Sequence, residues 1–152
     1  MNPSTRSPDQ STGSAPPLGV MASPSAVHSW LLLLRISVNG FMLTHGIPKL
    51  IRILNGDMSF GDPLGIGSGP SLVLATFAEA GCAVLVLLGF YTRLATLPLM
   101  FTMLVAAFIA HGGDPFGKKE LSLLYLLIYA TLFFVGPGKY SIDGRRVNNW
   151  RF

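Results

Sequence analysis

Three ionisable side chains and an asparagine occur in a segment that is otherwise apolar enough to cross a membrane. They lie in the stretch R-I-S-V-N-G-F-M-L-T-H-G-I-P-K, at Arg35, Asn39, His45 and Lys49. On a helix turning about 100° per residue, they fall within an arc of about 120°. A charge near the bilayer centre costs on the order of 2.5–3.5 kcal/mol, so such residues normally face a protein interior and meet partners there. The stripe therefore predicts a polar site inside a helical bundle, with an acid supplied by another helix.

Glu79 is the acid that this stripe requires, because it lies near the middle of the next apolar segment. Small residues share its helix face, so that neighbouring helices can approach closely there. With about 1.5 Å of rise per residue, Arg35 lies about 8 Å, Glu79 about 16 Å and His45 about 22 Å from one membrane surface. We expect Arg35 to reach Glu79, either as a buried ion pair that fixes helix register or as part of a functional site.

A second group of ionisable residues is expected at the opposite membrane surface. It contains His45, Lys49, His111 and Glu120, where two apolar segments end and another begins. Histidine titrates near neutral pH, so the group suits proton-coupled chemistry, although the same residues would also serve as interfacial groups that reach water. His45 and His111, on different helices at similar depth, could also ligate a haem, but no local spacing supports that ligation.

The composition places the chain among integral membrane proteins. Of its 152 residues 50% are hydrophobic and only 12% are charged, with a mean hydropathy of +0.52. The net charge of +4 does not indicate nucleic-acid binding, because the cations are scattered and mostly flank apolar segments. The single cysteine, Cys82, excludes an internal disulfide and a cysteine-based metal cluster, and no metal site is predicted. Any redox chemistry must therefore come from another molecule.

The apolar segments predict an all-α fold, a transmembrane four-helix bundle. Each segment is near the ~20 residues that cross the hydrocarbon core. The expected helices cover residues 27–50, 71–90, 93–111 and 120–135, the first ending near Pro48. Residues 27–136 form the bundle, residues 1–26 a flexible polar tail and residues 137–152 a basic C-terminal tail.

Charge asymmetry predicts the orientation of the bundle in the cell (inner) membrane. Four crossings put both termini on one side. That side carries six cations, against four on the other: Arg6, Arg93, Lys139, Arg145, Arg146 and Arg151, against Lys49, Arg52, Lys118 and Lys119. The positive-inside tendency then makes both termini cytoplasmic.

The order of these motifs resembles the DoxX family of small four-helix membrane proteins. The resemblance rests on R-x9-H-G-x2-K, E-x2-C, L-G-F-Y-T-R, A-x3-H, K-K-E-L-S-L-L and G-P-G-K-Y-S-I-D, over about residues 30–144. By this resemblance the family's polar signature positions are Arg35, His45, Gly46, Lys49, Glu79, Arg93, His111, Glu120 and Asp143.

The resemblance implies a quinone-linked or redox-associated membrane subunit, because the family takes its name from a subunit of an archaeal thiosulfate:quinone oxidoreductase. In one hypothesis the bundle binds a quinone head group, with His45 and Lys49 as hydrogen-bond donors and Glu79 as proton carrier. In another, the protein is a non-catalytic scaffold that docks a soluble redox enzyme. A third is a small-solute or proton pathway. The sequence does not decide whether the chain is an enzyme. It also leaves open the substrate, the direction of electron flow and the oligomeric state.

Overall fold

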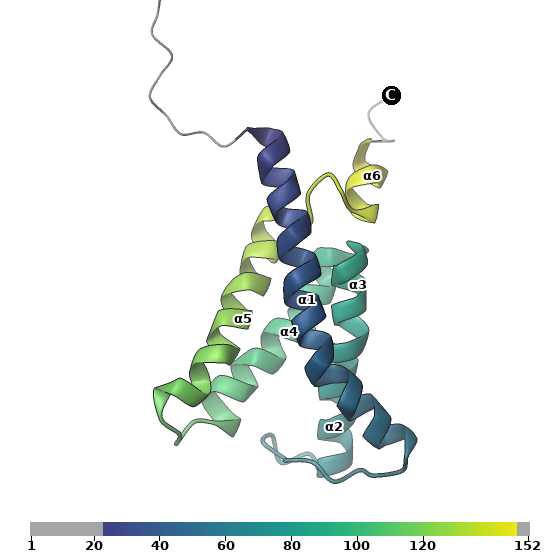
Figure 1. The fold of residues 1–152 in the computed structure, drawn as a ribbon. Helices are drawn as coiled ribbons and strands as arrows, with labels where there is room; N and C mark the ends of the chain where they lie inside the picture. The colour runs from purple at the N-terminus through teal and green to yellow at the C-terminus, as the bar shows by residue number, and fades with distance from the viewer. Residues whose placement is uncertain (1–22, 149–152) are drawn as a thin grey trace, which may run out of the picture.

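The structure is a computed structural model that describes residues 23–148, and the described residues form helices and no strands. Four helical rods pack into one bundle, which confirms the predicted all-α, membrane-spanning four-helix architecture (Figure 1). The elements are α1 (Pro24–Leu54), α2 (Ser68–Thr76), the π-helical segment η1 (Phe77–Cys82), α3 (Ala83–Leu88), α4 (Thr92–Val105), the π-helical segment η2 (Ala106–Ala110), α5 (Phe116–Val135) and α6 (Ile142–Asn148). Of the predicted tail over residues 1–26, residues 1–22 lie outside the described residues, and residues from Pro24 onward already belong to α1.

Three of the rods are long and apolar enough to cross a membrane: Pro24–Leu54, Ser68–Leu88 and Thr92–Ala110. α5 is the fourth, and it packs along α4. Its first turns carry Lys118, Lys119 and Glu120, and the rest of the helix is mostly apolar. Large apolar side chains on every rod face outward, as lipid contact requires.

α1 extends beyond both of its predicted ends. It begins at Pro24, where the Ser23 hydroxyl accepts a hydrogen bond from the Ala26 amide at 3.3 Å. The predicted stop near Pro48 is wrong, because the helix continues through that proline to Leu54. One proline removes a single ladder hydrogen bond, and packing against neighbouring helices makes that loss tolerable in membrane helices.

The chain reverses sharply between α3 and α4. Gly89 ends α3 in the left-handed conformation, with φ of 71°. Tyr91 also has a positive φ, 47°, and directly precedes α4. Because L-residues other than glycine rarely adopt this conformation, other contacts must hold the turn. These contacts come from the C-terminal segment.

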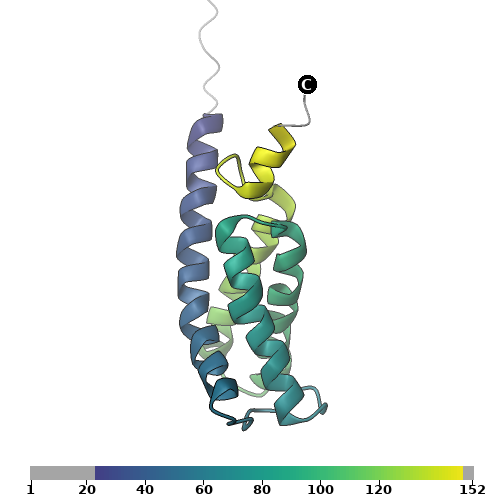
Figure 2. The same cartoon turned by 90° about the vertical axis from the view of Figure 1, so that its right-hand side faces the viewer.

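After α5 the chain folds back over this turn instead of leaving the bundle. Gly136 and Gly138 adopt positive φ values of 89° and 80°, and α6 follows. Figures 1 and 2 both show α6 beside the first part of α1, at the end of the bundle where α3 ends. The Lys139 amide donates to His28 Nδ1 at 3.4 Å. The start of α1 and the C-terminal helix therefore lie at the same end of the molecule.

Candidate functional site

The central polar contact is an ion pair between α1 and η1. Lys49 Nζ contacts Glu79 Oε2, and the two side chains are only 20% and 7% exposed. Gly46 makes the contact possible, since a Cβ there would lie 2.5 Å from the backbone C and O atoms of Glu79. The glycine lets the two backbones meet, and Lys49 lies three residues further along the same helix. The pair is thus built into the closest approach of the two rods.

Glu79 lies in a π-helical segment. η1 interrupts the rod formed by α2 and α3, and η2 likewise ends the rod that begins with α4. π-helical segments are rare and are often found at functional sites. Glu79 from η1, and Ala106 and Ala110 from η2, line the same cavity.

That cavity, which we call the charged cavity, has a volume of about 490 Å³. Most of its wall is apolar, and Lys49, Glu79 and His111 are its ionisable members. The loop between α1 and α2 closes one side. Phe60 of that loop places its ring 5.8 Å from Lys49 Nζ, a cation–π contact. The result is an apolar chamber with an ion pair in its wall, a typical composition for a small-molecule site.

Two aspartates brace the loop that closes the cavity. Asp62 accepts hydrogen bonds from the amides of Ile66 and Gly67, both at 2.9 Å. These bonds, chiefly the one from Gly67, lower the pKa of Asp62. Asp57 accepts from the hydroxyl and amide of Ser59, and these bonds lower its pKa to about 2.

The predicted ion pair between Arg35 and Glu79 is wrong. Arg35 NH2 instead donates to the Tyr140 carbonyl at 2.7 Å, and a Cβ on Gly89 would lie 1.8 Å from Arg35 NH1. Arg35 is therefore level with Gly89, ten residues beyond Glu79, which corresponds to about 15 Å along a helix. The depth estimate failed because it set Trp30 level with Phe90, whereas α1 begins at Pro24 and Arg35 is the residue that lies level with the turn at Gly89.

His111 lines the charged cavity together with Lys49 and Glu79. Its Nδ1 atom lies 2.8 Å from Asp114 Oδ2, and the ring is half-buried at the end of η2. The hydrogen bond with His111 is the main cause of the lowered pKa of Asp114. Lys49, Glu79 and His111 are thus the predicted site residues that the structure brings together.

The other predicted site residues lie elsewhere. His45 is exposed and packs edge-on against Tyr125, with ring centroids 6.2 Å apart. Asn39 accepts from the Tyr129 hydroxyl at 3.3 Å and donates to the Arg35 carbonyl at 2.8 Å. Glu120 is exposed at the start of α5. Of the predicted cluster of His45, Lys49, His111 and Glu120, Lys49 and His111 line the charged cavity, whereas His45 and Glu120 are not among its lining residues.

Asp143 and Arg93, two positions predicted from the family resemblance, hold helix ends together at the opposite end of the bundle. Asp143 accepts from the amides of Tyr91 and Thr92, both at 2.9 Å, and from the Thr92 hydroxyl at 3.0 Å. Arg93 NH2 donates to the Phe134 carbonyl at 3.4 Å. These contacts hold the turn before α4 in its unusual conformation.

The sequence prediction missed three contributors to the charged cavity: Phe60, the π-helical segments and Pro98. Pro98 within an apolar segment was a usable signal of irregular helix geometry. The sequence around Phe60 contains no comparable signal of its position, because the way in which a loop folds over a cavity depends on its tertiary contacts.

Helices of this length and polarity define an integral membrane bundle, and the ion pair beside an apolar cavity is its candidate site. The model of the DoxX family matches residues 30–112, which is more than half of the chain. The chain belongs to the DoxX family.

Three curated proteins are similar over most of their length. An uncharacterized protein of Haemophilus influenzae is 31% identical over 127 residues, covering 76% of this chain and 90% of its own. The inner membrane protein YphA of Escherichia coli is 30% identical over 126 residues, covering 76% and 89%. An uncharacterized membrane protein of Mycobacterium tuberculosis is 29% identical over 163 residues, covering 88% and 91%. No solved structure matches the chain significantly.

Proposed function

We propose that this DoxX-family membrane protein is a quinone-binding subunit of a membrane redox system. The observation that carries the proposal is the Lys49–Glu79 ion pair in the wall of an apolar cavity of about 490 Å³. A quinone ring needs such an environment: apolar walls for the ring and a few polar groups for its carbonyl oxygens. The electrons for its reduction would come from a redox protein that associates with this chain.

The ionisable residues of the cavity have distinct roles in this proposal. The Lys49 ammonium donates a hydrogen bond to one quinone carbonyl, and charge-assisted bonds of this kind are strong in a dry site. Glu79 holds or passes a proton, since reduction of a quinone to a quinol takes up two electrons and two protons. His111 lies in the same wall near the end of the helical rod, where it can exchange protons with water.

This proposal replaces His45 with His111 as the histidine of the site. His45 was the donor expected from the sequence, but its ring packs against Tyr125. His111 lines the cavity directly. The two histidines therefore provide a matched pair for testing the site.

The test is quinone retention by purified protein in lipid nanodiscs. Glu79→Gln and Lys49→Met should each lower the quinone retained per mole of protein by about tenfold, equivalent to about 1.4 kcal/mol of binding. His111→Ala should reduce quinone reduction by membranes more than it reduces binding. His45→Ala is the control and should change neither. If the cavity variants accumulate normally and retain as much quinone as the wild type, the proposal is wrong, and a scaffold that docks a soluble redox enzyme becomes the better hypothesis.

We also propose that the protein lies in the inner membrane with both termini in the cytoplasm. The shared position of α6 and the start of α1, and the predicted cation excess at that end, support this orientation. Reporter fusions after Pro17 and after Phe152 should both read cytoplasmic. A periplasmic reading at either end would contradict the proposed orientation.

A further inference from the structure

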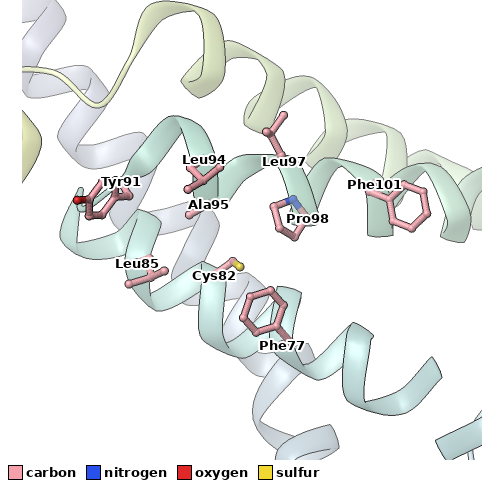
Figure 3. A pocket seen from close by; sticks show the side chains of 9 residues that line it. All are labelled: Phe77, Cys82, Leu85, Tyr91, Leu94, Ala95, Leu97, Pro98 and Phe101. Atoms are coloured by element: carbon pink, nitrogen blue, oxygen red, sulfur yellow. The ribbon is translucent and has the colours of Figure 1, made fainter. Parts of the chain in front are cut away.

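A second hollow lies on the outer face of the bundle. It follows the seam between the rod of η1 and α3 and the antiparallel helix α4, and its volume is about 520 Å³. Figure 3 shows Phe77 and Phe101 toward one end of this hollow and Tyr91 toward the other. We call it the outer groove. Its lining residues are Phe77, Cys82, Leu85, Tyr91, Leu94, Ala95, Leu97, Pro98 and Phe101.

The outer groove and the charged cavity share part of their walls. Phe77, Pro98 and Phe101 line both. Phe77 belongs to η1, the segment that also carries Glu79, and the other two come from α4. These three side chains therefore separate the ion pair's cavity from a groove on the outer surface, and a ligand that passed between them would occupy both.

The chemistry of the outer groove suits a flexible hydrocarbon chain. From Tyr91 to Phe101 the groove follows α4 for about 15 Å along the helix axis. Both rods are apolar enough to cross a membrane, so the groove faces acyl chains rather than water. Helix-docking surfaces in membranes are typically built from small residues that allow close backbone contact. Large side chains such as Leu94 and Phe101 line this groove instead, and they leave a hollow.

We propose that the outer groove holds the polyisoprenoid tail of the quinone whose head group occupies the charged cavity. This inference rests on the proposed function and specifies its substrate class: a long-tailed, membrane-dissolved quinone that enters sideways from the bilayer, past Phe77, Pro98 and Phe101. The head group then meets Lys49 and Glu79 while the tail stays in the groove. A short-tailed quinone would gain the head-group contacts only.

The experiment compares two quinones in the same nanodiscs. One is a ubiquinone with a single isoprene unit, the other a ubiquinone with a full-length polyisoprenoid tail, at equal mole fractions. Leu94→Trp fills the groove at a distance from the cavity, and Leu127→Trp on α5 is the control. The two leucines are 64% and 65% exposed, so both substitutions place an indole on the lipid-facing surface.

Wild-type protein should retain the long-tailed quinone in preference to the short one. Leu94→Trp should lower retention of the long-tailed quinone by about tenfold while sparing the short-tailed one, and Leu127→Trp should change neither. If both quinones bind the wild type equally, and Leu94→Trp leaves both unchanged, the groove assignment is wrong although the head-group site stands. The same conclusion follows if Leu94→Trp displaces phospholipid but no quinone. If neither quinone is retained by the wild type, the proposed function itself fails.

Discussion

Lys49 on α1 pairs with Glu79 on η1, next to the point where Gly46 brings the two backbones together. Each charge is compensated within the bundle, so neither has to be exposed to hydrocarbon. The same pair forms part of the wall of the charged cavity. A contact that holds two helices in register thus also supplies the polar groups of the candidate site.

This pairing predicts strong coupling in a double-mutant cycle. Lys49→Met or Glu79→Gln alone removes one partner of a largely buried pair, which costs about 3 kcal/mol, the lower end of the usual range because Lys49 is 20% exposed. The double variant should cost clearly less than the sum of the two. Thermal unfolding in mild detergent measures all four proteins.

The control cycle combines Arg35→Gln with Glu79→Gln. Arg35 hydrogen-bonds to the Tyr140 carbonyl at the other end of the bundle, so these two substitutions should be additive within about 0.5 kcal/mol. The structure would be contradicted if the effects of Arg35→Gln and Glu79→Gln on stability were coupled while those of Lys49→Met and Glu79→Gln were additive.

Gly46→Ala should destabilise the bundle. The added Cβ would lie 2.5 Å from the Glu79 carbonyl oxygen and 2.7 Å from the Ala80 amide nitrogen, so α1 would have to move away from η1. Overpacking of this kind costs about 1–3 kcal/mol.

Gly40→Ala is the matched control on the same helix, because nothing lies within 4 Å of a Cβ there. It should be neutral or stabilise by up to about 1 kcal/mol through helix propensity. Equal effects of the two substitutions on unfolding temperature would argue against the close approach.

The sequence predicted the helices well because membrane crossing imposes a strong constraint of length and polarity. It also identified Glu79 as the acid that compensates a cation on α1. The predicted partner, Arg35, was wrong and the observed partner is Lys49. The identity of the partner depends on how far the two helices are shifted along their axes, which the sequence does not specify. An error of a few residues in the register of α1 placed Arg35 within reach of Glu79, whereas it lies level with Gly89.

The features that shape the charged cavity were much less predictable. Phe60 contacts Lys49 from a loop that hydrogen bonds to Asp57 and Asp62 brace, and no periodic pattern encodes that fold. The C-terminal helix α6 was equally difficult to predict from the sequence. Asp143 lies in a polar segment that indicates a tail, and its role appears only when the chain folds back onto Thr92.

The loop that covers the charged cavity should loosen in acid. Hydrogen bonds from Ser59, with help from Arg52, lower the pKa of Asp57 from 3.8 to about 2. A carboxyl with a lowered pKa in the folded state stabilises that state above the unfolded value of 3.8 and loses this contribution as pH falls through about 2. Asp57→Asn should therefore lower stability at neutral pH, and the difference from wild type should vanish between pH 3.8 and about 2. Hydrogen exchange of the Ser59 amide against pH measures this, and a difference that persists at the acid end would contradict it.

Asp143→Ala should release α6 from the turn before α4. The cap residue of α4, Tyr91, makes no side-chain hydrogen bond of its own, so the Asp143 carboxylate supplies the acceptor for the first amides of the helix. Loss of a helix cap costs about 0.5–2 kcal/mol. The amides of Tyr91 and Thr92 should exchange faster, and the unfolding temperature should fall. Arg145→Ala, an exposed residue on the same short helix, is the control and should leave both readouts near wild type. If the two amides exchange at the wild-type rate in Asp143→Ala, the carboxylate does not cap α4, and the positive φ of Tyr91 must be held by other contacts.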